Sequence, residues 1–388
     1  MARRGETGRY EVTTVGGESV RAFVPNPLPP APPLVMEGGL QPLLEAATLA
    51  VGRLDGISAL LPDKSLFLYT YVRKEAVLSS QIEGTQSSLS DLLLFELDEA
   101  PGVPLDDVIE VSNYVAALDL GLERLRGGFP LSKRLIREIH GVLLSRGRGS
   151  GRDPGEFRRS QNWVGGTRPG KALYVPPPHP AIPDCMAALE QFIHAEDDGL
   201  PMMVRAGCAH VQFETIHPFL DGNGRVGRLL ITLLLCHAGM LHEPLLYLSL
   251  YLKQNRSTYY ELLDRVRSQG DWEEWLSFFL RGVFEAANGA VSTARRLVEL
   301  FRSDREIVEQ TGRRSGSGLR VHEALKARPI QSMPALRAAT SLSFPAVASA
   351  IDLLVEKRIV RELTGKRRNR LFVYDRYLTI LNEEDNEP

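Results

Sequence analysis

The sequence predicts a mainly helical protein that carries one β-hairpin and ends in a small C-terminal domain. Apolar residues recur at helical spacing in residues 74–85 and again in residues 131–144, which indicates amphipathic helices. The run at residues 229–235, apolar except for Thr232, indicates a further, buried helix. Within residues 155–178, two short apolar runs flank a connection rich in glycine and proline, and this pattern indicates the hairpin.

The N-terminal part of the chain divides into an arm and a helical region. Residues 1–35 end in a proline-rich run, so we expect an extended arm that does not fold independently. Residues 36–115 are expected to be helical. Within them, the helix over residues 74–85 has an apolar face and a suitable C-terminal stop at Gly84.

A central core and a small C-terminal domain follow. Residues 116–300 are expected to form the core, and the glycine- and serine-rich residues 312–318 a flexible linker. In the domain at residues 312–388, helices are expected at residues 321–327, 333–339 and 344–356, and strands at residues 360–363 and 371–374. Three helices and a basic hairpin look like a winged helix, whose second and third helices would form a helix-turn-helix.

Two kinds of partner fit this C-terminal domain. The basic wing, formed by Lys366, Arg367, Arg368 and Arg370, is suited to the backbone of duplex DNA. The third helix is a poor base-reading surface, because Pro345 opens it and it exposes mainly Ser349, Asp352 and Glu356. An interaction or dimerisation module, which would make the protein a homodimer, is therefore an equal alternative.

Composition limits the class of protein. The 388 residues are enough for two or three domains, and the net charge of −2 creates no overall field that attracts nucleic acid or membrane. The three cysteines lack metal-ligand spacing and suit a reducing compartment. The N-terminus has no apolar signal core, and no apolar span of eighteen residues occurs. We therefore expect a cytoplasmic protein with no membrane partner.

The segment at residues 217–228 has the side chains needed to hold a nucleotide phosphate chain. Its glycines let successive backbone N–H groups converge on an anion, at the N-terminus of the buried helix. Arg225 and Arg228 are three residues apart and can both clamp phosphate. Asp221 is a hard oxygen ligand suited to Mg²⁺. The imidazole of His217 suits a general base near neutral pH.

Other interpretations of this segment explain less of it. Gly222, Gly224 and Gly227 match the dinucleotide fingerprint G-x-G-x-x-G, with Glu243 about twenty residues further on. That fingerprint should follow a buried strand, and two arginines in its glycine turn are foreign to it. No P-loop sequence occurs in the chain. A purely structural glycine turn would leave the joint presence of carboxylate, amide and arginines unexplained.

The segment resembles the signature of the Fic family, His-x-Phe-x-[Asp/Glu]-Gly-Asn-[Gly/Lys]-Arg-x-x-Arg, at every specified position. The resemblance implies a mainly helical Fic core that transfers AMP from ATP to a Tyr, Thr or Ser hydroxyl of a target protein. It implies that His217 deprotonates this hydroxyl and that Asp221 holds Mg²⁺. Asn223 would orient the phosphates, Arg228 would reach the γ-phosphate, and Phe219 would anchor the loop. The ATP-binding set implied here is Gly222, Asn223, Gly224, Arg225, Val226, Gly227 and Arg228.

A second motif lies far upstream. Glu83 alone would be interpreted as a solvated glutamate. However, Ser79-x-x-x-Glu83-Gly84 matches the inhibitory motif [Ser/Thr]-x-x-x-Glu-[Gly/Asn] of Fic proteins. The resemblance implies that Glu83 pairs with Arg228 and that Ser79, one turn earlier, supports the helix or the carboxylate. It places the chain among Fic proteins that carry the inhibitory helix before the core.

Two further elements are interpreted through the same resemblance. The predicted hairpin looks like the Fic flap, whose extended edge pairs with a target segment, including one from the protein itself; a plain surface hairpin is the alternative. Related Fic proteins use polar and aromatic residues after the buried helix to hold adenosine. Asn255, Tyr251 and Tyr259 are the candidates here, although aromatic residues at this spacing are commonly core.

These observations predict a cytoplasmic, self-inhibited Fic adenylyltransferase that uses ATP and Mg²⁺. One alternative keeps the fold but uses another nucleotide, or removes AMP from protein with Glu83 helping to activate water. The other is a DNA-binding regulator with a sensory Fic core. The complete signature, from His217 to Arg228, argues against a degenerate core.

Overall fold

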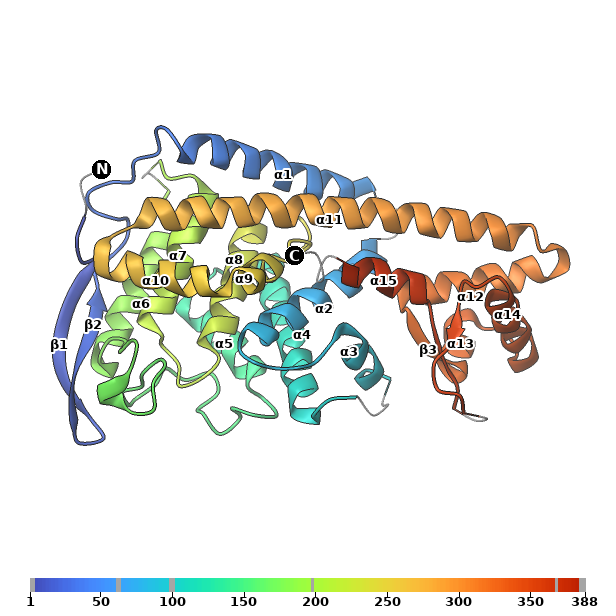
Figure 1. The fold of residues 1–388 in the computed structure, drawn as a ribbon, viewed down its shortest axis with the longest axis horizontal. Helices are drawn as coiled ribbons and strands as arrows, with labels where there is room; N and C mark the ends of the chain where they lie inside the picture. The colour runs from blue at the N-terminus through green and yellow to red at the C-terminus, as the bar shows by residue number, and fades with distance from the viewer. Residues whose placement is uncertain (1–3, 61–63, 98–101, 197–198, 367–368, 384–388) are drawn as a thin grey trace.

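The computed structural model describes residues 4–60, 64–97, 102–196, 199–366 and 369–383. The chain is built almost entirely of α-helices, with two small antiparallel sheets (Figure 1). The predicted mainly helical class is therefore confirmed. The helices up to the C-terminal domain are α1 (Leu40–Leu60), α2 (Lys64–Ile82), α3 (Leu89–Phe95), α4 (Leu105–Arg126), α5 (Lys133–Leu143), α6 (Ile182–Ile193), α7 (Met202–Ile216), α8 (Asn223–His237), α9 (Ser249–Gln254), α10 (Arg256–Gln269) and α11 (Trp272–Glu309).

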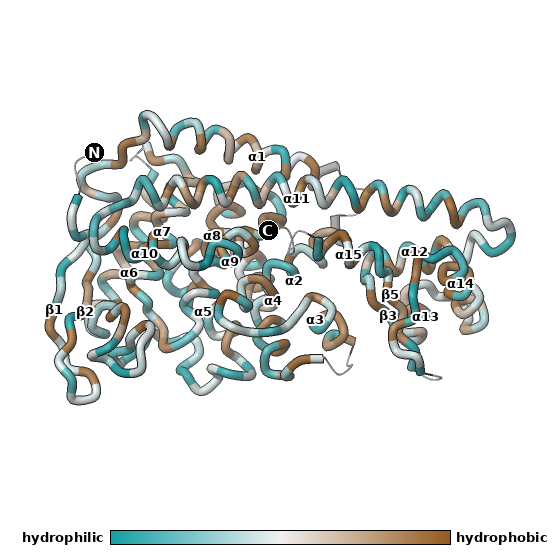
Figure 2. Tube along the Cα trace, viewed as in Figure 1, coloured by the Kyte–Doolittle hydropathy of each residue, from teal (hydrophilic) through white to brown (hydrophobic). Residues whose placement is uncertain are grey.

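The centre of the fold is the pair α7 and α8, which pack against each other. The predicted buried helix is α8, in which residues 225–235 are all buried. Helix α11 is 38 residues long and lies alongside α1 on the outside of this core (Figure 1). Hydrophobic and hydrophilic residues alternate along α11, as expected for a helix with one buried face (Figure 2). The core boundary expected at residue 300 therefore falls inside a continuous helix.

The expected extended arm is wrong for residues 8–25, which form a β-hairpin. Strands β1 (Gly8–Val15) and β2 (Glu18–Pro25) pair antiparallel over their full length. Gly16 and Gly17 make the two-residue turn with φ of 57° and 83°, a combination that glycine adopts without strain. The hairpin is not isolated, because Val20 and Ala22 pack on Val175 in a small apolar cluster.

The predicted flap is a loop closed by one antiparallel bridge, between Val164 and Tyr174. The short 3₁₀ helix η1 (Pro169–Lys171) lies between the two arms. Beyond Tyr174 the chain reaches three consecutive prolines, which have no N–H to donate to a ladder, so the pairing cannot extend. A second 3₁₀ turn, η2 (His179–Ala181), leads into α6.

The C-terminal domain contains the three predicted helices and additional elements. Its elements are α12 (Ser315–Ala327), β3 (Ile330–Ser332), α13 (Met333–Thr340), α14 (Phe344–Glu356), β4 (Arg361–Glu362), β5 (Leu371–Val373) and α15 (Asp375–Glu383), with strand order β3-β5-β4. Strand β3 and helix α15 were not predicted. The angle of 108° between α13 and α14 is within the range of helix-turn-helix pairs. Arg367 and Arg368 of the predicted wing lie outside the described residues.

The flexible linker expected at residues 312–318 is wrong. The 3₁₀ turn η3 (Gly312–Arg314) leads directly into α12. Gly318 lies against Val308 and Leu353, so that a side chain there would crowd both residues. This glycine therefore serves close packing between helices.

The C-terminal domain contacts the helix that carries the predicted inhibitory motif. Lys74 on α2 donates to the Leu381 carbonyl of α15, and the hydroxyls of Thr70 and Tyr377 lie 3.1 Å apart. Helix α15 also packs on α11 (Figure 1). Helix α2 thereby connects the N-terminal helical region to the C-terminal domain.

Within the described ranges, no helix on its own combines the length and the hydropathy needed to cross a membrane. The bent pair α13 and α14 meets that test by length and composition when the two are taken together.

We expect Trp275→Ala to be strongly destabilising. The Trp275 ring is fully buried, and its indole N–H donates to the Gly207 carbonyl on α7 at 2.9 Å. Removing it leaves a large cavity between α11 and α7, at a cost of about 3–5 kcal/mol. Urea unfolding measures this change, and the partly exposed Phe284 of the same helix provides the control variant Phe284→Ala. Similar losses for both variants would contradict the assignment of Trp275 to the centre of the core.

Candidate active site

The loop between α7 and α8 begins and ends in the left-handed region. His217 ends α7 with a φ of 49°, and Gly222 precedes α8 with a φ of 75°. The residue before a proline avoids the right-handed helical conformation, so Pro218 explains why α7 stops at His217. The loop consequently turns sharply and directs the N-terminus of α8 towards the same side as His217.

The loop is held by the side chain of Asn223. Its Oδ1 accepts from the Phe219 N–H, and its Nδ2 donates to the Phe219 carbonyl, both at 2.9 Å. The Phe219 ring is buried and stacks on His140 with centroids 3.7 Å apart. The amide of Asn223 thus shapes the loop, and its predicted role in orienting phosphates stays a prediction. Phe219 lies in the core, as expected of an anchor.

His140, which the sequence did not single out, fixes the other side of the loop. Its Nδ1 accepts from the Gly155 N–H at 2.8 Å, so Nε2 carries the proton and donates to the Asp221 carbonyl at 3.0 Å. Burial lowers the pKa of His140 to about 4, which keeps the ring neutral. The ring thereby joins α5, the start of the flap and the loop.

Arg158 joins the flap to the loop and was also missed. It is buried, and its Nε donates to the His217 carbonyl at 3.0 Å. Its terminal nitrogens donate to the carbonyls of Ser160 and Pro177, at 3.1 and 2.5 Å. The partners of this arginine are backbone carbonyls on both arms of the flap. No local sequence pattern signals such contacts.

The imidazole of His217 is half-buried and neutral. Burial, followed by the nearby Arg158 guanidinium, lowers its pKa to about 4. A ring with this pKa is unprotonated at neutral pH, so one nitrogen can accept a proton from a substrate. A neutral ring is what a general base requires, and the catalytic role of His217 stays a prediction.

Asp221 presents an accessible carboxylate. Its side chain is 42% exposed; Oδ1 accepts from the Gly222 N–H at 2.6 Å and lies 3.7 Å from Arg225 Nη2. Across the described ranges, no cluster of three or more His, Cys, Asp or Glu side chains could hold a metal ion. One exposed carboxylate fits Mg²⁺, which usually takes one or two protein carboxylates together with substrate phosphates.

Arg225 differs from the expected phosphate clamp. Its side chain is only 4% exposed, and its Nη1 lies 3.0 Å from Oε2 of the buried Glu110 on α4. Arg148 pairs with the other oxygen of Glu110 at 2.8 Å. The Nε of Arg225 is buried and has no hydrogen-bond partner among the described residues. Glu110 was missed because it lies 115 positions earlier, although an acidic residue between the apolar Val108 and Val111 was a visible signal.

Arg228 makes the predicted ion pair with Glu83. The Nη2 of Arg228 lies 2.7 Å from Glu83 Oε1 and donates to the Ser79 carbonyl at 3.0 Å. Its Nε donates to the Ser79 hydroxyl at 2.8 Å. A Cβ at Gly224 would overlap Glu83 Oε1, so the carboxylate rests on the first turn of α8. The glutamate therefore lies where an anion would bind at this helix N-terminus.

The charges around this ion pair reinforce it. Burial raises the pKa of Glu83, but Arg228 outweighs burial and holds this pKa below its ordinary value.

Glu214, in the last turn of α7, was not predicted to be part of the site. Burial raises its pKa to about 7, and its Oε1 is buried without a hydrogen-bond partner in the described part of the chain. Gly227 leaves room for this carboxylate, since a Cβ there would overlap it.

The end of α2 is also held by the segment after α8. Lys253 donates to the Gln81 side chain at 2.8 Å, and Arg256 donates to the Ile82 carbonyl at 3.2 Å. Tyr260 lies close enough to Glu83 that this carboxylate, after burial, contributes to raising the pKa of the phenol to about 12. Tyr260 therefore flanks the ion pair together with Tyr259, whose pKa both Arg228 and Glu83 also affect.

Several residues predicted to contact nucleotide lie in the core instead. Tyr251 packs on Phe278, and the hydroxyl of Tyr259 bonds to His210 at 2.8 Å. Both rings are buried because they lie on the inner faces of α9 and α10. Asn255 donates to the Tyr251 carbonyl at 3.0 Å at the junction of these helices. Val226 is buried in the hydrophobic core.

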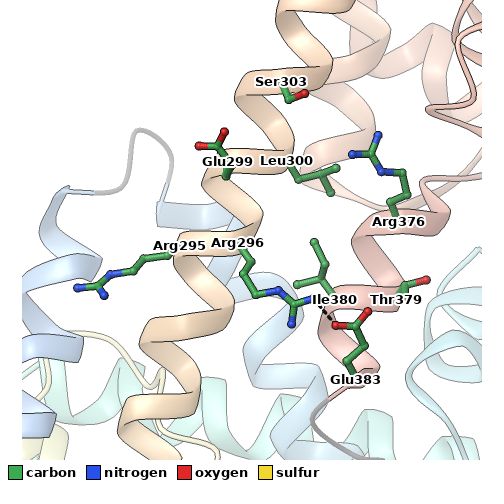
Figure 3. Close-up of a pocket in the computed structure, with 9 residues that line it drawn as sticks. All are labelled: Arg295, Arg296, Glu299, Leu300, Ser303, Arg376, Thr379, Ile380 and Glu383. Atoms are coloured by element: carbon green, nitrogen blue, oxygen red, sulfur yellow. Dashed lines mark hydrogen bonds and ion pairs between the residues drawn. The ribbon is translucent and has the colours of Figure 1, made fainter.

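A groove of about 730 Å³ between α11 and α15 is separate from this site (Figure 3). It is lined by Arg295, Arg296, Glu299, Leu300, Ser303, Arg376, Thr379, Ile380 and Glu383. Arg296 and Glu383 form an ion pair across it. None of the residues predicted from the sequence lines this groove.

Comparison with known families finds matches in two regions of the chain. Residues 41–123 match the N-terminal region of the Fic/DOC family, and residues 130–235 match the Fic/DOC family itself. The site described above lies in these two regions, apart from the segment after α8. These two regions of the chain are therefore similar to the Fic/DOC family.

The curated relatives are protein adenylyltransferases. The protein adenylyltransferase Fic of Culex quinquefasciatus is 34% identical over 177 residues, which are 44% of this chain and 32% of that protein. The protein of the same name from Drosophila grimshawi is 31% identical over 175 residues, 44% of this chain and 33% of that protein. The chain thus spans about a third of the length of these relatives.

Solved structures share the fold. A Fic family protein from Desulfovibrio desulfuricans is 21% identical and superposes with a TM-score of 0.55, covering 86% of this chain and 96% of that one. A Fic domain containing signaling protein from Bacteroides thetaiotaomicron is 20% identical with a TM-score of 0.51, covering 64% of this chain and 97% of that one. The helical Fic fold predicted from the sequence is therefore confirmed.

The buried His140 predicts acid sensitivity of the folded state. Its pKa is about 4 when folded, against about 6.5 for an exposed histidine, so between these values the unfolded chain binds the extra proton. Its contribution to the free energy of unfolding is therefore lost as pH falls from about 6.5 to 4, by at most about 1.4 kcal/mol per pH unit. Urea unfolding between pH 7 and 4.5 should show a shallower pH dependence for His140→Gln. Parallel pH profiles for variant and parent would contradict this prediction.

Proposed function

We propose that the protein is a self-inhibited adenylyltransferase, which transfers AMP from ATP to a Tyr, Thr or Ser hydroxyl of a target protein, including itself. The observation that carries this proposal is the Glu83 carboxylate, which pairs with Arg228 and rests on Gly224 at the N-terminus of α8. A carboxylate in that position supports a phosphate-binding site at this helix N-terminus, which Glu83 would block. The names of the relatives support the reaction type.

The residues of the loop suit nucleotidyl transfer. The neutral imidazole of His217 would accept the proton of the target hydroxyl as its oxygen attacks the α-phosphorus. The bond between the α-phosphorus and the bridging oxygen would break, and pyrophosphate would leave. Backbone N–H groups of residues 222–224 would stabilise the charge on the phosphate oxygens. Asp221 would hold Mg²⁺ beside the phosphates, where the ion neutralises their charge.

Self-inhibition would follow from competition for Arg228. While Glu83 pairs with this guanidinium, a γ-phosphate loses a donor and meets a negative charge. ATP would bind with its α-phosphate displaced from the line of attack, and a displacement of about 1 Å can cost a factor of ~100 in rate. Release requires Glu83 to move away while Arg228 remains in place.

We expect Glu83→Gly to raise self-modification by about ten- to a hundredfold, because it removes the competing carboxylate. Arg228→Ala also breaks the ion pair, but it should stay inactive because the phosphate loses its clamp. Mass spectrometry of protein incubated with ATP and Mg²⁺ measures both. Glu83→Gln, which removes the charge and keeps the shape, separates electrostatic competition from loosening of α2. A Glu83→Gly protein that is folded but no more active than the parent would overturn the self-inhibition model.

We expect His217→Ala, made together with Glu83→Gly, to abolish transfer while ATP still binds. The phosphate donors of α8 are intact in this variant, so calorimetry should give an ATP dissociation constant close to that of Glu83→Gly alone. Undiminished self-labelling would show that His217 is not the base.

Two alternatives keep the Fic fold but change the reaction, and the same purified protein tests both: use of another nucleotide, and removal of AMP from protein. Parallel incubation with labelled ATP, GTP, CTP and UTP identifies the nucleotide. Incubation of AMP-modified protein with the parent and with Glu83→Gln tests removal of AMP. If the parent releases AMP and Glu83→Gln does not, the hydrolytic alternative holds and the transferase proposal fails.

For the C-terminal domain, the contacts favour an interaction module over a DNA reader. The exposed positions of α14 include Ser349, Asp352 and Glu356, none of them basic. The same domain contacts α2 at two points, where Leu381 accepts from Lys74 and where the hydroxyls of Tyr377 and Thr70 meet. We therefore propose that it stabilises the inhibitory helix. Salt-sensitive binding of duplex DNA by the full-length protein would instead support the DNA-binding alternative.

A further inference from the structure

The flap is attached at its tip to the N-terminal hairpin. Glu18, at the turn of the hairpin, accepts from the Gly170 N–H at 2.9 Å and pairs with Arg168 at 3.2 Å. At the other end, the Phe23 N–H donates to the Val175 carbonyl at 2.9 Å. The flap has a single bridge of its own, so these contacts determine where its second arm lies.

A cleft of about 320 Å³ lies between the hairpin, the second arm of the flap and the end of α10. Its lining includes residues from β1 and β2, residues 169–170 and 172–175 of the flap, and Asp264, Arg267 and Ser268 of α10. The cleft is thus built from three parts of the chain that the fold brings together, and two of them, the hairpin and α10, lie outside the matched family regions.

Two arginines line this cleft, each stacked on a tyrosine ring. The guanidinium of Arg21 lies 4.2 Å from the Tyr10 ring centroid, and that of Arg267 lies 4.1 Å from the Tyr174 centroid. Stacking fixes the plane of a guanidinium and leaves its edge N–H groups available to an anion. Such a pair of preoriented cations suits a carboxylate.

The charge balance of the cleft supports the same ligand. Asp264 is the anionic residue of the lining and pairs with Arg267 at 3.3 Å. Within the described residues, Arg21 has no ion-pair partner, and the Nε of Arg267 is buried without a hydrogen-bond partner. Arg21 is therefore the unneutralised cation among the described residues of this cleft, and a further carboxylate would neutralise it.

The cleft is connected rigidly to the catalytic loop. The hydroxyl of Tyr174 donates to the Thr215 carbonyl at 2.6 Å, two residues before His217. Arg158 ties the His217 carbonyl to the Pro177 carbonyl. A protein segment held in the cleft is thereby placed relative to the proposed base.

We propose that the cleft between the N-terminal hairpin and the flap binds an acidic side chain of the target protein, near the residue that receives AMP. This inference rests on the proposed function. Its partner is an extended protein segment with an Asp or Glu close to the modified Tyr, Thr or Ser. Arg21 is the principal contact, Arg267 is the second, and Glu18 positions the flap wall.

Direct binding of fluorescent peptides tests the proposal without any chemistry. The probes are ten-residue peptides with one central tyrosine, flanked by Ala and by a single Glu or, in the matched set, a single Lys at each position in turn. We expect the best Glu peptide to bind about tenfold more tightly than its Lys counterpart at low salt. Arg21→Gln should remove most of this preference, and Arg21→Glu should reverse it.

Arg9→Gln is the matched control, because Arg9 lies on the same hairpin, pairs with Glu11 and does not line the cleft. It should keep the Glu preference of the parent, and thermal unfolding verifies that all variants are folded. Peptides that show no Glu preference, or a preference unchanged in Arg21→Glu, would overturn the proposal.

The transfer reaction then separates this inference from the proposed function. The same peptides are incubated with ATP, Mg²⁺ and the Glu83→Gly protein, and AMP incorporation is measured by mass spectrometry. Preferential labelling of Glu peptides, lost in Arg21→Gln, supports both proposals. Glu-selective binding with no AMP incorporation by any peptide or by the protein itself would refute the transferase proposal and leave the acidic-side-chain site standing.

Discussion

The site is organised by the need to satisfy one buried guanidinium. Arg228 is 2% exposed, and burying a charge is costly unless a partner and hydrogen bonds compensate it. Ser79 and Glu83, on a helix that precedes Arg228 by about 145 residues, provide those partners. The end of α2 is consequently fixed against α8. Under the proposed function, Glu83 satisfies the arginine that would otherwise hold a phosphate, and inhibition would follow from the same electrostatics as binding.

The sequence could predict what short-range patterns encode. Helix α14 has the predicted bounds, residues 344–356, and the apolar run at residues 229–235 lies in the buried α8. The ion pair of Glu83 was predicted because two motifs of one family resemblance name both partners. The hairpin at residues 8–25 was missed because the prolines that follow it dominated the interpretation, although Gly16-Gly17 is a turn signal.

Long-range polar contacts explain what the sequence could not predict. Glu110, Arg158 and Glu214 act on the loop from α4, the flap and α7, and their partners are backbone groups or charges distant in sequence. Propensity and periodicity describe neighbours on one element and contain no information on such pairs. The tyrosines of α9 and α10 failed for a related reason, since aromatic side chains at helical spacing turn inward whenever the core has room for them.

The parts of the site differ in how firmly they are held, and this difference determines what can move. Arg228 and Arg158 are buried, and each makes three hydrogen bonds. Asn223 is buried and makes a pair of hydrogen bonds to the backbone of Phe219. Glu83 is 35% exposed and stands at the end of α2, immediately before Gly84 with its φ of 100°. A small rearrangement at this helix end can therefore withdraw the carboxylate without disturbing the loop. Because α15 and the segment after α8 both contact α2, either surface can transmit such a rearrangement to the N-terminus of α8, where the phosphate is proposed to bind.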